Sequence, residues 1–266
     1  MSEQHVYLDT TILIASFIHS PKVKFEIREK IKSFRNVLTG QVAQQEFTRR
    51  LLKEAEYLLG QLKKRKTVAA VQRHLLSLSQ LQNRKFRICL QTLTTIHEGA
   101  TAEDNADRLR WFLEELLEDA VEDIKELLGC EILADVGCAC AIQGIKKKGK
   151  SYDFPNSKCS TYVQCGVSQF LEDHPDTEPL KDFLLEKQDL LTTELKDGLG
   201  FLTRVCKDST CAPLFNPCLC FGDTIISLES RRAEVFYTQN HKESKLLCEQ
   251  SGQVLLLCPT NDDKLP

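Results

Sequence analysis

Three acidic residues, far apart along the chain, have the chemistry needed to bind a divalent cation: Asp9, Glu46 and Asp223. Asp9 directly follows an apolar run at residues 6–8, where burial of an unbalanced charge would be unfavourable. Carboxylates brought close together repel one another, and a hard cation such as Mg²⁺ or Mn²⁺ relieves that repulsion through oxygen ligands. These residue types predict a metal site, provided that the fold brings the three together.

The segments around these acids alternate between short apolar runs and amphipathic stretches. Residues 6–8 and 36–39 predict two strands, and a helix is expected from residue 41 onward. Towards the end of the chain, residues 235–238 and 253–258 predict two more strands, each preceded by a helix. Such alternation favours a parallel sheet flanked by helices, an α/β fold in which ligands bind at the carboxyl ends of the strands.

The middle of the chain has a different pattern, with helical spacing over residues 67–96, 103–129 and 178–195. We therefore expect residues 1–58 and 214–266 to form one α/β core. Residues 59–213 would then be a long, mostly helical insertion that carries many of the cysteines.

Composition narrows the class of protein. The chain has 266 residues, of which 42% are hydrophobic and 27% charged. No apolar run approaches the roughly 20 residues of a membrane-spanning helix, and the start MSEQH has no signal-peptide pattern. A cytoplasmic protein that does not enter membranes is expected. The net charge of -3 does not indicate a basic nucleic-acid-binding domain, although local basic patches remain compatible with one.

Three segments, in order along the chain, resemble motifs of the PIN-domain nucleases. YLDTTIL is similar to the first-strand motif, with Asp9 in the metal-binding position, and LTGQVAQQEF is similar to the second motif, with Glu46 as its acid. GDTIISLESRRAEVFYTQN resembles the closing segment, with Asp223 as the third acid and with Thr238 and Asn240 in its "threonine, any, aspartate" turn. The resemblance covers roughly residues 1–58 and 214–262, and it does not extend to the central insertion.

The resemblance implies a PIN-like fold and metal-dependent endonucleolytic hydrolysis of phosphodiester bonds, in RNA rather than DNA. It implies that the three acids hold Mg²⁺ or Mn²⁺. Asn240 stands where the family has a fourth acid, and its amide brings an oxygen but no charge. Hydrogen bonds that support the ligands would come from three hydroxyl groups, those of Thr10, Thr11 and Thr238.

Each of these residues also has an ordinary structural explanation. Asp9 and Asp223 are both suited to capping a helix, and Glu46 alone could be an exposed helical residue. Asn240 is a common turn residue. Two basic runs are either solvated surface or phosphate contacts at the rim of the site; they comprise Lys63, Lys64, Arg65, Lys66, Lys146, Lys147, Lys148 and Lys150.

Two other functions stay open at this stage. One is a PIN-like module with little or no catalysis that binds RNA or protein, which Asn240 and the large insertion favour. The other is a phosphatase of the haloacid-dehalogenase type, but that family requires an acid where this chain has Thr11. The insertion and an acidic helix around residues 114–123 are compatible with a protein partner or a homodimer.

Twelve cysteines without an export signal favour reduced thiols over disulfides. None of the cysteines in the middle of the chain forms a CxxC pair, so unpaired buried thiols are favoured over a structural zinc site. Cys89, Cys248 and Cys258 are expected to be small buried apolar residues.

Overall fold

The fold was analysed in a computed structural model of the chain. The structure describes residues 4–19, 21–79, 107, 109–111, 113–114, 129–137, 146–148, 151–153, 166–208 and 221–258.

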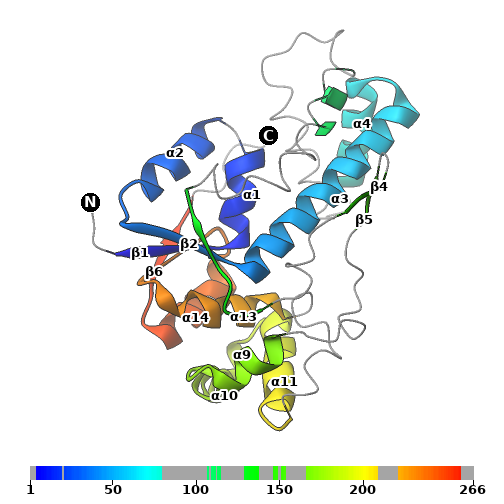
Figure 1. Ribbon diagram of the computed structural model, residues 1–266. Helices are drawn as coiled ribbons and strands as arrows, with labels where there is room; N and C mark the ends of the chain where they lie inside the picture. Colours follow the sequence, from blue (N-terminus) through cyan, green and yellow to red (C-terminus); the bar gives the residue numbers. More distant parts are fainter. Residues whose placement is uncertain are drawn as a thin grey trace.

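A five-stranded parallel sheet forms the centre of the molecule (Figure 1). Its strands follow the order β3-β2-β1-β6-β7, so strands from distant parts of the chain lie next to each other. Their bounds are β1 His5–Leu8, β2 Asn36–Gly40, β3 Glu131–Leu133, β6 Val235–Thr238 and β7 Val254–Leu257. The central strand β1 therefore ends beside β6, and Leu8 pairs with Tyr237.

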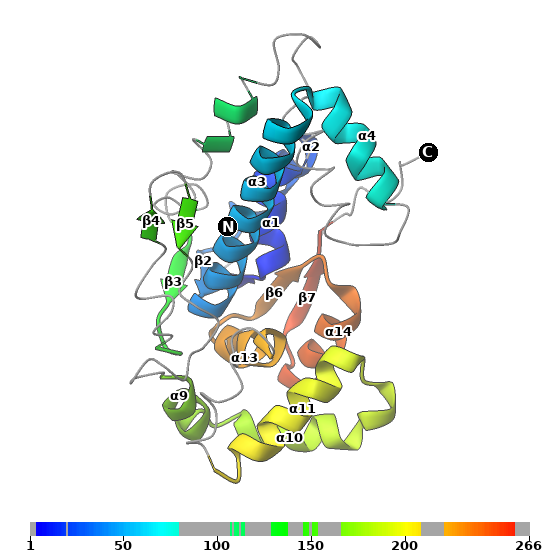
Figure 2. The ribbon, with the colours of Figure 1, turned by 90° about the vertical axis from the view of Figure 1, so that its right-hand side faces the viewer.

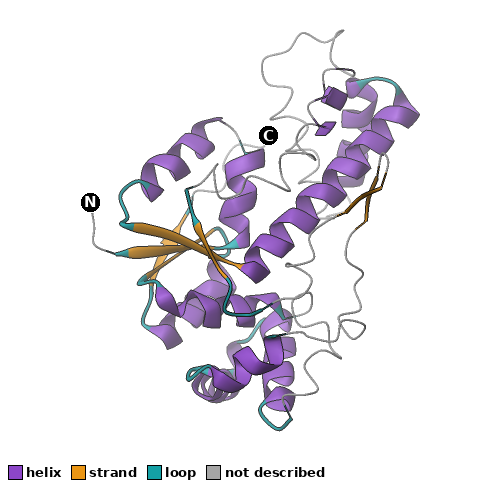
Figure 3. Ribbon diagram, in the orientation of Figure 1, coloured by secondary structure: helices purple, strands orange, loops and turns teal. Residues whose placement is uncertain are grey.

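Helices cover both faces of this sheet, as Figures 1 and 3 show. On one face lie α1, Thr10–Ile18, and α2, Pro21–Ile31. On the other face lie α13, Gly222–Glu229, and α14, His241–Ser251. The four residues of β6 are all buried, as a strand covered on both faces must be. The expectation of an α/β fold with a parallel sheet and flanking helices is confirmed.

Helix α3, Gln41–Arg65, is long and packs against both α1 and α13. It begins immediately after β2, and its apolar stripe includes Phe47, Leu51 and Leu58, all buried. Helix α4, Val68–Ser79, folds back beside α3 (Figure 2). The remainder of the helix expected over 67–96, and most of the one expected over 103–129, lie outside the described residues.

Three shorter helices pack beyond α13, as Figure 2 shows. They are α9, Val167–Asp173, α10, Thr177–Glu186, and α11, Thr193–Val205. The single helix expected over 178–195 is wrong, because the chain ends α10 at Glu186 and restarts at Thr193. Thr192 is the reason for the new start, since its side chain accepts a hydrogen bond from the Leu195 amide at 3.4 Å as an N-cap.

Part of the range assigned to the insertion lies in the central sheet. Strand β3 pairs with β2 in parallel register and forms one edge. A three-residue strand is too short to show a sequence period, which explains why the pattern did not reveal it. Two other short strands, β4, Lys146–Lys148, and β5, Ser151–Asp153, form a separate antiparallel pair. Within the described residues, no helix is both long and apolar enough to span a membrane.

Candidate active site

The carboxylate of Asp9 is held by two threonines at the carboxyl ends of β1 and β6. Its Oδ2 accepts hydrogen bonds from the hydroxyls of Thr238, at 2.6 Å, and Thr11, at 2.8 Å. Each hydroxyl also accepts a hydrogen bond from a backbone amide. The Asn240 amide donates to the Thr238 hydroxyl, and the Gln239 amide donates to the Thr11 hydroxyl, both at 2.9 Å. The two hydroxyls also lie 3.1 Å from each other. Because an ionised carboxylate can only accept hydrogen bonds, both hydroxyls act as donors in their contacts with Asp9.

Capping does not explain Asp9. Asp9 is the N-cap residue of α1, but its side chain makes no capping hydrogen bond. Its backbone carbonyl begins the helix, accepting from the amides of Ile12 and Leu13. The side chain is only 6% exposed, and no hydrogen bond to Oδ1 is found in the described part of the chain. One oxygen is therefore fixed by hydroxyls, and the second is available to a ligand.

Glu46 lies just beyond the first turn of α3 and faces the same region. Its Oε2 accepts a hydrogen bond from the Thr10 hydroxyl at 3.0 Å, which ties α3 to the start of α1. A Cβ built on Gly222 would lie 3.9 Å from the same oxygen. Glu46 therefore lies between Thr10, which follows Asp9, and Gly222, which precedes Asp223.

Asp223 is partly buried in the first turn of α13. Phe221 is the N-cap of that helix, so the capping role expected for Asp223 as an alternative is not observed. Burial, together with repulsion from Asp9 and Glu46, raises the pKa of Asp223 to about 7. Asp9 and Glu46 thus lie close enough to Asp223 for their charges to act on it.

Two more acids contribute to this negative field, and the sequence did not single them out. Repulsion from Glu243, in the first turn of α14, and from Glu194, in the first turn of α11, also raises the pKa of Asp223. Acids in the first turn of a helix are common, because they interact favourably with the helix dipole. Nothing in the sequence distinguishes these two from ordinary residues of that kind.

The donor chemistry suits a hard cation, but the side chains do not form a closed set of ligands. Within the described residues, there is no group of three or more His, Cys, Asp or Glu side chains that could hold a metal ion. Carboxylates that repel one another without a counter-ion stay apart, which is consistent with the effect on Asp223. Binding would require these side chains to move together or to coordinate through water.

Asn240 is placed by its backbone rather than by its side chain. Its amide donates to the Thr238 hydroxyl, and its side chain makes no capping hydrogen bond to α14, although it occupies the N-cap position. The residue is therefore at the same edge as Asp9. Thr11, which occupies the position where a dehalogenase-type phosphatase needs an acid, is committed through its hydroxyl to Asp9.

The first basic run lies far from these acids along α3. Lys63, Lys64, Arg65 and Lys66 are exposed at the end of α3. They are 17 or more residues beyond Glu46, or about 25 Å along a helix that rises about 1.5 Å per residue. Lys146–Lys148 form β4, with only the backbone described, and Lys150 lies outside the described residues.

Cysteine provides no ligand set in the described part of the chain. Among the described residues, Cys130, Cys206, Cys248 and Cys258 form no disulfide, and burial raises the pKa of the last three thiols. Burial of Cys248 and Cys258 confirms their expected role as small apolar residues. Most of the other cysteines considered for zinc lie outside the described residues; they are Cys138, Cys140, Cys159, Cys165, Cys211, Cys218 and Cys220.

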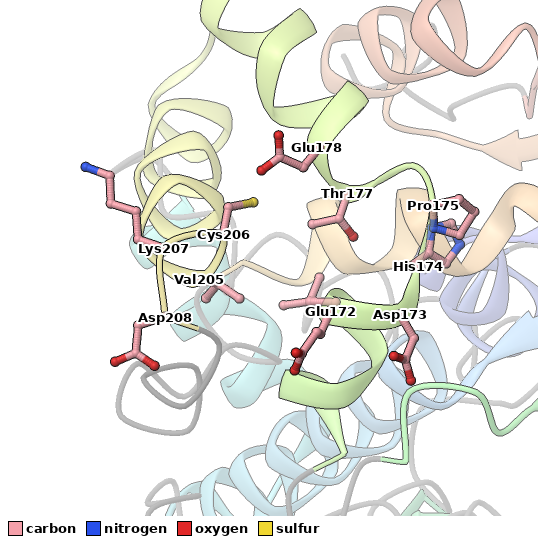
Figure 4. A pocket seen from close by; sticks show the side chains of 11 residues that line it. Glu172, Asp173, His174, Pro175, Thr177, Glu178, Val205, Cys206, Lys207 and Asp208 are labelled. Atoms are coloured by element: carbon pink, nitrogen blue, oxygen red, sulfur yellow. The ribbon is translucent and has the colours of Figure 1, made fainter.

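Two pockets lie away from the three acids. One, of about 560 Å³, lies among α9, α10 and the end of α11, and Figure 4 shows its lining. The other, of about 460 Å³, lies beside Asp135, Phe170 and Glu229. Neither includes Asp9, Glu46 or Asp223. We place the candidate site at the acids because Asp9 and Glu46 both act on the charge of Asp223.

Comparisons of the chain with protein-family models, with curated proteins and with solved structures found no match.

Proposed function

We propose that the protein is a metal-dependent endonuclease of the PIN-like type that hydrolyses phosphodiester bonds in RNA. One observation carries this proposal: Asp9 is held by hydroxyls at the carboxyl end of the sheet, and Asp9 and Glu46 both repel the charge of Asp223. An arrangement of like charges at a strand edge is unfavourable unless it serves to bind a cation.

The residues would divide the work as follows. Asp9, Glu46 and Asp223 would supply oxygen ligands to Mg²⁺ or Mn²⁺, with Thr11 and Thr238 fixing the orientation of Asp9. Thr10 would fix Glu46 in the same way, and Asn240 would offer an uncharged amide oxygen. When bound, the cation would stabilise the charge that develops on the phosphate and promote attack by water.

Cleavage of labelled RNA tests the proposal. Wild-type protein should cut single-stranded RNA with Mg²⁺ or Mn²⁺ and stop in EDTA, and DNA should be cut less. Asp9→Asn keeps the size of the side chain but removes its charge, and should lower the rate by about 100-fold or more. Asp197→Asn, an exposed change on α11, serves as the matched control and should leave the rate unchanged. Equal cleavage by wild type and Asp9→Asn would exclude the proposal.

A second candidate function is a PIN-like module that binds RNA or protein without cutting. Two observations favour it: Asn240 in place of an acid, and the lack of a closed ligand set in the described residues. RNA retention in a filter-binding assay without any cleavage, under both metals, would favour this function over the nuclease.

A further inference from the structure

Glu229 is a buried carboxyl group with contacts to several elements. It is the last residue of α13 and is only 1% exposed. Its Oε2 accepts a hydrogen bond from the Tyr7 hydroxyl at 3.1 Å, and its Oε1 accepts from the Gln41 amide at 3.1 Å. It also accepts from the Val42 amide. Through these contacts it joins β1 to the beginning of α3.

Glu229 acts as the cap that α3 does not supply itself. Gly40 is the N-cap residue of α3 and has no side chain, and the first turn of the helix contains no acid. The free amides there need acceptors, and a carboxyl group is a favourable one at a helix N-terminus. A Cβ built on Gly40 would overlap the Glu229 carboxyl group. The glycine therefore leaves the space that this long-range cap occupies.

The three elements that Glu229 connects are the ones that carry the candidate ligands. Tyr7 precedes Asp9 by two residues, and Gln41 precedes Glu46 by five. Glu229 itself follows Asp223 by six residues on the same helix. Helix α13 thus meets α3 at both of its ends, at Gly222 beside Glu46 and at Glu229 beside Gln41.

We propose that Glu229 is the positioning residue that fixes Asp9, Glu46 and Asp223 relative to one another by joining β1, α3 and α13. Glu229 makes its contacts to neighbouring residues rather than to the acids, so it has no part in the chemical step. The effect that we expect Glu229 to have on metal binding rests on the proposed function. Asp9 and Glu46 both repel Asp223, and the buried hydrogen bond from the Gln41 amide to Glu229 holds α13 against α3 in spite of this repulsion.

The amide of glutamine can replace this carboxyl group. Burial raises the pKa of Glu229 to about 8, against the opposite effect of its hydrogen bonds, so the neutral form predominates at pH 7. Glu229→Gln keeps the size of the side chain and an oxygen for Gln41, whereas Glu229→Ala removes both contacts. Ile27→Ala is the matched control for lost stability, because Ile27 is fully buried in α2, a helix on the other face of the sheet.

Two measurements on the full-length chain test the inference. Mn²⁺ affinity is measured by electron paramagnetic resonance, and the ¹³C shifts of the Asp9, Glu46 and Asp223 carboxyl groups are measured by NMR at one fixed pH without metal. Glu229→Ala should weaken Mn²⁺ binding by about 10-fold or more and shift all three signals. Glu229→Gln should restore both properties to near wild type, and Ile27→Ala should leave both unchanged although it unfolds at a lower temperature.

The outcomes separate this inference from the proposed function. If wild type binds Mn²⁺ and Glu229→Ala binds it equally well, Glu229 has no positioning role and the nuclease proposal is unaffected. If wild type binds no Mn²⁺, the nuclease proposal fails, and the carboxyl shifts alone decide the inference. Signals that move equally in Glu229→Ala and Ile27→Ala would overturn it, because the effect would then be general loss of packing.

Discussion

The two ends of α13 carry carboxyl groups in opposite situations. Glu229, at the end of the helix, is buried among donors, and its hydrogen bonds oppose the rise in its pKa. Asp223, at the beginning, is surrounded by acids, and each of them raises its pKa further. Burial raises the pKa of both groups, but hydrogen bonds partly offset this effect at Glu229, whereas neighbouring charges add to it at Asp223.

This difference indicates which end serves stability and which serves function. A folded protein places unfavourable groups together at sites where binding or catalysis needs them, and compensates with stabilising contacts elsewhere. Both groups lie in the eight-residue helix α13, where the hydrogen-bonded Glu229 is only six residues from Asp223. Changes at the Glu229 end should therefore lower stability, and changes at the Asp223 end should raise it.

The largest effect is expected from Gly40→Ala. The new methyl group would overlap the Glu229 carboxyl group and displace the cap of α3. Overpacking and the lost cap together should cost about 3 kcal/mol, or about 6–12 °C in Tm for a chain of this size, measured by circular dichroism. In the Glu229→Ala background the same change should cost clearly less, because the overlapping group is gone. Equal costs in both backgrounds would contradict the steric explanation.

Divalent cations should stabilise the Asp223 end. Mn²⁺ at about 100 times its Kd should add about 2.7 kcal/mol, or about 5–10 °C in Tm, measured by differential scanning calorimetry. Asp9→Asn should abolish this gain, whereas Asp197→Asn should retain it. A gain of the same size in Asp9→Asn would place the binding elsewhere.

Asp223→Asn should stabilise the protein without metal at high pH. The folded-state pKa of Asp223 is about 7, above its ordinary value of 3.8, so the folded state binds more protons between these values. The free energy of unfolding must then decrease as pH rises from about 4 to 7. The raised pKa of Glu229 extends this decrease to about pH 8. The variant should gain about 3 °C in Tm at pH 8, near 1 kcal/mol, and nothing at pH 4. A gain that does not depend on pH would show that charge is not the cause.

The smallest effect is expected from Asn240→Asp. The change adds a charge at the edge where Thr238 holds Asp9. Mn²⁺ affinity, measured by isothermal titration calorimetry, should increase about threefold, a modest gain for one extra oxygen charge near a cation. The metal-free protein should be slightly less stable at pH 8, because another like charge joins the group. Unchanged affinity would indicate that residue 240 lies outside the coordination sphere.

The sequence predicted the acids better than it predicted what holds them. Asp9, Glu46 and Asp223 lie at the ends of periodic segments, so the α/β pattern alone brought them to one edge. Thr11 and Thr238 were expected as supporting hydroxyls and do bind Asp9.

Glu229 was not predicted, because a glutamate inside an amphipathic helix has no local feature that indicates burial. Its partners, Tyr7 and Gln41, are 222 and 188 residues away, and only the strand order brings them close. For the same reason, the sequence did not show that Gly40 is needed to leave space for the Glu229 carboxyl group. The break between α10 and α11 depends on a single capping threonine, a signal weaker than the helical period on either side.

The strand order also has a consequence for the timing of folding. Strand β1 pairs with β6, and the carboxylate of Asp9 obtains the Thr238 hydroxyl only across 229 residues of intervening chain. During synthesis on the ribosome, Asp9 and Glu46 emerge long before Asp223 and Glu229. A nascent polypeptide that has not reached residue 223 therefore carries two of the three acids, and its Asp9 carboxylate still lacks the Thr238 hydroxyl.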